Sequence, residues 1–164
     1  MNSDPYWVAD PQSGELSLSK ARYYDVDLSA AGTTTMDMQA VIDHLVISGD
    51  DAGLDVTADG LLLSLTEINQ KRGKVNVDGL LATYGDYSLT KGLISGTGSI
   101  VANVVDNVSG VIAPATIGTT GTLTINGSVM MASASGLAID LGENGVSDVL
   151  DVRGFATDSP FGTI

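Results

Sequence analysis

Short runs in which apolar and polar residues alternate recur along the chain, and each run is bounded by Gly, Asp or Asn. Such alternation predicts β-strands, because successive side chains of a strand point to opposite faces of the sheet. One pattern, Gly-x-Leu/Val-x-Val/Ile-x-Gly, occupies residues 73–79 and 121–127, and residues 148–154 repeat it with Asp in place of the first Gly. The predicted strands lie within residues 44–49, 53–57, 60–65, 73–79, 87–90, 98–104, 110–114, 121–127, 136–141 and 148–154.

Two architectures accommodate short strands separated by turns. A sandwich would join them by two-residue hairpin turns, for which Asp59-Gly60, Asp78-Gly79 and Asn126-Gly127 are suitable. The turns differ in length, however, and the Gly-bounded strand returns at irregular intervals of roughly 20 residues, which is typical of a solenoid. The pattern therefore favours an all-β fold of the single-stranded parallel β-helix type.

In a β-helix one side of each strand points into a narrow core, where like residues of successive coils stack. Aliphatic residues suit this core, and aromatic residues make up only 5% of the chain. We expect Thr122, Thr124 and Asp140 to face outward, since alternation fixes the opposite side of the strand. The predicted core consists of Leu45, Ile47, Leu54, Val56, Val75, Val77, Leu123, Ile125, Leu137, Ile139, Leu141, Val149 and Val152.

The predicted organisation is one β-helical segment over residues 1–164, cut from a longer protein. Residues 1–40 contain Trp7, Tyr6, Tyr23 and Tyr24, and we expect less regular coils or a cap there. Residues 41–164 show the clearer repeats. The start of the chain has no basic stretch followed by an apolar one, so it does not resemble a signal peptide.

Charge and composition exclude several classes of function. The 164 residues include 7 Lys and Arg against 20 Asp and Glu, a formal net charge of −13. This argues against partners such as nucleic acid or anionic lipid, which need a cationic surface. There is no Cys and a single His, His44, which excludes thiol chemistry and any site built on two imidazoles. No apolar run is long enough to span a membrane.

Residues 93–154 contain a Ser-Gly-x-Ile-x-Pro block at 109–114, a Gly-Thr-Leu-Thr-Ile-Asn-Gly strand at 121–127 and a Ser-Asp-x-Leu-x-Val strand at 147–152. With these motifs the region resembles the β-helical passenger region of bacterial autotransporters. Ala115 departs from it, because the family usually has Gly after the Pro. The resemblance implies a right-handed parallel β-helix, secretion to the cell surface, and a C-terminal barrel that anchors the full-length protein in the outer membrane. It also implies a host or cell-surface partner.

Two groups of residues could support hydrolysis or metal binding. His44 follows Asp43, but adjacent side chains of a strand point to opposite faces, and no Gly-x-Ser-x-Gly motif is present. Asp50, Asp51, Asp55 and Asp59 have the ligand type that calcium prefers, although their spacing matches no EF-hand loop. The simpler interpretation is a surface histidine and solvated turn residues.

Two further groups suggest carbohydrate chemistry. Asp140, Glu143, Asp148 and Asp151 with Arg153 provide the acids and the base of a lyase-like site. Lys71-Arg72 with Lys74 could bind an anionic sugar or a phosphate. Charges on a wet outer surface explain both groups equally well.

We therefore expect a non-enzymatic structural segment of a secreted autotransporter, serving as a rigid β-helical stalk, scaffold or adhesive surface. We expect no catalytic, cofactor-binding or metal-binding residues. The alternative is a carbohydrate-active β-helix that binds or cleaves a polysaccharide. A groove with clustered acids and a poised base would distinguish an enzyme from a stalk, which needs only repeats.

Overall fold

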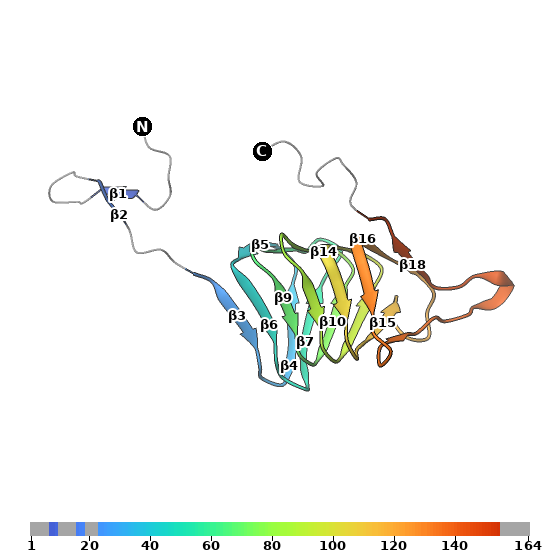
Figure 1. Ribbon diagram of the computed structural model, residues 1–164. Coiled ribbons are helices and arrows are strands. Elements are labelled where there is room, and N and C mark those ends of the chain that lie inside the picture. The colour runs from blue at the N-terminus through green and yellow to red at the C-terminus, as the bar shows by residue number, and fades with distance from the viewer. Residues whose placement is uncertain (1–6, 10–15, 19–22, 155–164) are drawn as a thin grey trace.

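The computed structural model describes residues 7–9, 16–18 and 23–154. Figure 1 shows parallel strands stacked as a β-solenoid of about 5 turns. The fold is nearly all-β, as the alternation predicted, and the only helical element of the described residues is the 3-10 turn η1 (Glu143–Gly145). No described helix is long and apolar enough to cross a membrane.

Each turn of the solenoid contributes a strand to each of three faces. The first face contains β4 (Gly32–Met36), β7 (Ala52–Val56), β10 (Lys74–Val77), β13 (Leu93–Gly96), β15 (Val111–Pro114) and β17 (Gly136–Leu137). The second contains β5 (Gln39–Ile42), β8 (Leu61–Ser64), β11 (Leu80–Thr83), the first parts of β14 (Ser99–Asn107) and β16 (Thr122–Met131), and β18 (Val149–Val152). The third contains β3 (Asp25–Leu28), β6 (His44–Ile47), β9 (Ile68–Gln70), β12 (Tyr87–Leu89) and the last parts of β14 and β16.

All strand pairs of the solenoid are parallel. The turns Asp59-Gly60 and Asp78-Gly79 are therefore corners between faces and not hairpins, which excludes the sandwich. Outside the solenoid, β1 (Trp7–Ala9) and β2 (Leu16–Leu18) pair antiparallel. The predicted strand at 136–141 is shorter than expected, since only Gly136 and Leu137 remain extended in a sheet.

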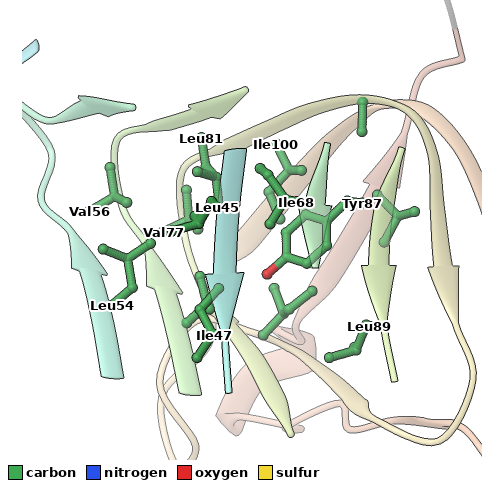
Figure 2. Close-up of a cluster of buried hydrophobic side chains, with 14 of the residues drawn as sticks. Leu45, Ile47, Leu54, Val56, Ile68, Val77, Leu81, Tyr87, Leu89 and Ile100 are labelled. Atoms are coloured by element: carbon green, nitrogen blue, oxygen red, sulfur yellow. The ribbon is translucent and has the colours of Figure 1, made fainter. Parts of the chain in front are cut away.

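The core is a set of ladders in which side chains of one face stack from turn to turn. Figure 2 shows Leu45, Ile68 and Tyr87 from the third face meeting Leu81 and Ile100 from the second. Parallel, in-register pairing causes this stacking, because it places equivalent residues of consecutive turns at the strand spacing of about 4.8 Å. The ladder of the first face consists of Leu54, Val75, Ile94 and Ile112.

The predicted core is confirmed in the middle of the solenoid. Thr122 is exposed, as expected, while Thr124 and Asp140 are only half-exposed. The confirmed core residues are Leu45, Ile47, Leu54, Val56, Val75, Val77, Leu123 and Ile125.

The prediction is wrong for the last turn. The exposed fractions there are 44% for Leu137, 39% for Ile139, 83% for Leu141, 46% for Val149 and 45% for Val152. Among the described strands, β17 pairs only with β15 and β18 only with β16. Leu137 and Val152 pair with the buried Ile112 and Ile125, but no described turn stacks on their far side. Val149 pairs with the outward-facing Thr122, so the inward residue at that end of β18 is Leu150, which packs against the core.

Ala115, which stands where the resemblance implies Gly, has a left-handed backbone with φ of 60°. Its methyl group is buried, with an exposed fraction of 2%. Left-handed φ is the conformation that glycine adopts without steric cost. The corner after Pro114 thus keeps a glycine-like geometry with alanine.

Candidate functional site

The outward side of the first face carries a shallow groove with a volume of about 310 Å³. Gly53 contributes to the hollow because it has no side chain, whereas Lys74 and Leu93 occupy the same column on the next two turns. The lining residues are Thr33, Gly53, Leu54, Asp55, Lys74, Asn76, Leu93, Ser95 and Thr116.

A ladder of hydrogen bonds forms the floor of this groove. Asn76 donates its Nδ2 to Asp55 Oδ1 at 2.9 Å, and Ser95 Oγ donates to Asn76 Oδ1 at 3.1 Å. These residues share one column of the first face, since Asp55, Asn76 and Ser95 pair in register. The alternation of the strands turns them outward, and the stacking brings them within hydrogen-bond distance.

Asp78 lies at the corner that follows β10. It accepts hydrogen bonds from Asn76 Nδ2 at 2.9 Å, from the Thr97 amide at 2.9 Å and from the Thr97 hydroxyl at 3.0 Å. Partial burial acts to raise the pKa of Asp78, but these three donors favour the carboxylate and together hold its pKa below 3.8, the ordinary value. Asp78 therefore fixes its corner as a charged acceptor.

A second polar group lies inside the solenoid. Tyr87 is fully buried and donates its hydroxyl to Gln70 Oε1 at 2.7 Å. Gln70 Nε2 in turn donates to the carbonyls of Gly73 and Leu93, both at 3.1 Å. Desolvation strongly raises the pKa of Tyr87, so it acts as a neutral donor. The group anchors the corner that precedes β10.

That corner carries a cluster of cations. Within residues 23–154 the chain has five Lys and Arg, of which Lys71, Arg72, Lys74 and Lys91 lie on two consecutive turns. Leu89 pairs with Gln70 and Leu93 with Lys74, so Lys91 takes the position of Arg72 on the next turn. We call these four residues the basic corner. The sequence drew attention to the first three but not to Lys91, which only the register places beside them.

A hollow of about 190 Å³ lies between the side chains of the basic corner. Asp50 borders it and forms an ion pair with Arg72, with Oδ2 2.9 Å from Nη1. In the described part of the chain Lys71, Lys74 and Lys91 have no carboxylate within 4.0 Å. The hollow is lined by Asp50, Arg72, Gly73, Lys74, Lys91, Gly92 and Leu93.

His44 contacts a glutamate and an amide and not a nucleophile. Its Nε2 lies 3.4 Å from Glu67 Oε1 and 3.0 Å from Asn69 Nδ2, while Asn69 also donates to Glu67 at 2.8 Å. Asp43 accepts a hydrogen bond from the Tyr24 amide at 2.7 Å. The structure therefore does not bring the carboxylate of Asp43 to His44.

The first acidic group is spread over one turn. Asp50 and Asp51 precede β7, Asp55 lies within it, and Asp59 follows it. Asp50 pairs with Arg72 and Asp55 accepts from Asn76. No group of three or more His, Cys, Asp or Glu side chains suited to a metal ion is present among the described residues.

In the second acidic group, two carboxylates accept hydrogen bonds from backbone amides and a third pairs with an arginine. Asp148 is buried, with an exposed fraction of 5%, and accepts hydrogen bonds from the amides of Gly121 at 2.8 Å and Asp140 at 2.9 Å. Asp140 accepts from the Gly118 amide. Asp151 pairs with Arg153 at 2.7 Å on the same strand. In these contacts Asp140 and Asp148 act as structural acceptors.

Comparison with known proteins adds no relative on which to base a function. No family model, curated protein or solved structure matches the chain. Since one fold can support many functions, the function of this solenoid depends on its own surface features.

Proposed function

We propose that this chain is a rigid, non-enzymatic β-solenoid segment of a secreted surface protein of the autotransporter type. Its role is to act as a scaffold or stalk that presents its outer faces at the cell surface. The observation that supports this role is the parallel stacking of buried, mainly aliphatic side chains from turn to turn on all three faces.

This stacking is a source of stiffness. The backbone of each inner turn forms hydrogen bonds with the turns on both sides, so bending the solenoid would break several bonds at once. Each turn adds one strand spacing, so about 5 turns give a rise of roughly 24 Å at 4.8 Å per turn. A longer scaffold is obtained by adding turns, with no change of the core pattern.

Surface location is tested with antibodies against residues 23–154 in the organism that carries the protein. The expected result is labelling of intact cells and loss of this labelling when a protease is added outside. Labelling only after the cells are permeabilised would overturn the proposed location.

The absence of enzymatic activity is tested with the purified chain. We expect no turnover of esters, peptides or acidic polysaccharides, because the His44 ring contacts Glu67 and Asn69 and no nucleophile. Activity that is lost in His44→Ala or Arg153→Ala would contradict the scaffold role and favour the carbohydrate-active alternative.

A further inference from the structure

We propose that the basic corner and the adjoining groove bind an acidic polysaccharide, a linear chain of sugars that carry carboxylate or sulfate groups. The site adds a binding function to the scaffold role and does not depend on where the protein resides. Three observations support it: the charge of the corner, the shape of the hollows and the acceptor oxygens in the groove.

Positive charge is concentrated at the basic corner. The chain has 20 acidic residues and 7 basic ones, so most cations could be neutralised by a neighbouring carboxylate. Lys71, Lys74 and Lys91 are exposed and have no carboxylate within 4.0 Å in the described part of the chain. With Arg72 they outnumber Asp50 and Asp51, the two carboxylates that share a hollow with Lys74, and salt screens their attraction for an anion over a Debye length of about 10 Å at 0.1 M.

The shape of the corner suits an anionic ligand. In the stacked turns an ideal Cβ on Gly92 would lie 2.3 Å from the carbonyl oxygen of Gly73, so the two corners are in close contact. Arg72 and Lys91 therefore repeat at about the strand spacing. The hollow between them, about 190 Å³, is large enough for a sugar ring with its charged group.

The two hollows meet at Lys74, which lines both the hollow at the corner and the larger groove of about 310 Å³. Along that groove Asp55, Asn76 and Ser95 present acceptor oxygens, because Asn76 Nδ2 donates to Asp55 and Asp78 and the Ser95 hydroxyl donates to Asn76. These oxygens can accept hydrogen bonds from sugar hydroxyls, so a chain can place an anionic group at the corner and uncharged hydroxyls in the groove.

The same features disfavour a nucleic acid. Single-stranded nucleic acids bind through aromatic side chains on which bases stack, and neither hollow is lined by an aromatic residue. The anion class that fits is therefore a polysaccharide.

The test measures binding of the purified chain to polygalacturonate and to heparin by calorimetry at 50 mM and 300 mM NaCl. The two polymers distinguish carboxylate from sulfate as the recognised group. We expect binding to at least one of them that weakens at the higher salt, and none to neutral dextran. Inorganic sulfate, a DNA oligonucleotide and the variants below complete the experiment.

Matched variants separate the basic corner from net charge. Lys74→Gln, Lys91→Gln and Arg153→Gln each remove one positive charge from an exposed side chain, but only the first two lie at the corner. We expect a loss of about threefold for each corner variant, about tenfold for their double variant, and less than twofold for Arg153→Gln. Asp50→Asn frees Arg72 from its ion pair and is expected to strengthen binding about twofold.

Three outcomes would overturn the proposal. One is an absence of binding to both acidic polymers at 50 mM NaCl. Another is an equal loss in Lys74→Gln and Arg153→Gln, which would show that only net charge matters. The third is binding of inorganic sulfate or DNA as tight as that of the polysaccharide. Circular dichroism of each variant verifies that the solenoid is folded.

Discussion

At the scale of single residues, the corners impose the strictest demands. Gly96 has a φ of 117°, and an ideal Cβ at this position would lie 2.1 Å from the Val77 carbonyl oxygen. Gly32 has a similar φ of 126°, but a Cβ there would have no neighbour within 4 Å. At both positions a residue with a side chain would be strained by the positive φ. Only at Gly96 would the added Cβ also collide with a neighbouring atom.

Gly96→Ala should therefore destabilise the fold more than Gly32→Ala. We expect a loss of about 3 kcal/mol for Gly96→Ala, from strain plus overpacking, against about 1 kcal/mol for Gly32→Ala, from strain alone. Urea unfolding followed by circular dichroism measures both. Equal losses would mean that the corner at Gly96 relaxes around the added methyl group.

Asp78 provides a prediction on pH. Its pKa is lowered in the folded state, so the carboxylate contributes stability above its unfolded value of 3.8, and this contribution is lost as the pH falls through the lower folded value. Asp78→Asn keeps an acceptor but removes the charge from three hydrogen bonds.

We expect Asp78→Asn to lower the stability by about 1 kcal/mol at pH 7, because these hydrogen bonds are charge-assisted but exposed. The difference from the wild type should stay constant down to about pH 5 and shrink below pH 3.8. Unfolding curves at pH 7, 5 and 3 measure it. A difference that is unchanged at pH 3 would contradict a role for the charge.

At the scale of elements, the side chain of Asp148 links the segment between β17 and β18 to the neighbouring turn. Asp148 accepts hydrogen bonds from Gly121, at the start of the neighbouring turn, and from Asp140 within the segment. A buried amide that loses its acceptor costs about 1–3 kcal/mol. The segment has little other regular structure, since it contains only the short η1 turn.

Asp148→Ala should therefore loosen this segment and leave the middle turns unchanged. We expect amide hydrogen exchange of residues 138–148 to become at least tenfold faster, which corresponds to about 1.4 kcal/mol. Exchange of Val75 and Ile94, in the inner turns, should not change. Glu143→Ala is the control, because Glu143 is exposed in the same segment. Equal effects of the two variants would contradict the role of Asp148.

At the scale of the whole molecule, the last turn exposes both apolar side chains and strand edges. Leu137, Leu141 and Val152 are exposed there, and the outer edges of β17 and β18 have no partner among the described strands. Unpaired strand edges can pair with a second chain. Repulsion between chains of net charge −13 opposes this association at low salt.

We therefore expect a monomer at 50 mM NaCl and weak, reversible self-association at 500 mM NaCl, measured by sedimentation equilibrium. Val152→Lys, on β18, should suppress the association because it adds a charge at the edge. Leu65→Lys alters an exposed apolar residue in the inner turns and should leave the self-association unchanged. A monomer whose mass is independent of salt and concentration would count against an open end.

Much of the fold could be predicted from the sequence alone, because the information is local. Alternation in residues 73–79 and 121–127 placed Val75, Val77, Leu123 and Ile125 in the core, since the side-chain period of a strand is two. The irregular return of this pattern favoured parallel stacking over hairpins. The net charge and the cluster of cations at Lys71, Arg72 and Lys74 can also be read from the sequence.

Only the tertiary structure decided which residues become neighbours across turns. Val152 pairs with the buried Ile125 but is exposed, because burial requires a turn on both sides, whereas Val149 pairs with Thr122 and faces outward. Lys91 joins the basic corner, and Asp55 joins Asn76 and Ser95, through a register that depends on the length of each corner. Local sequence determined the strands, because alternation is a property of neighbouring residues. Corner lengths vary along this chain, so only the stacking of the turns determined which side chains form a common surface.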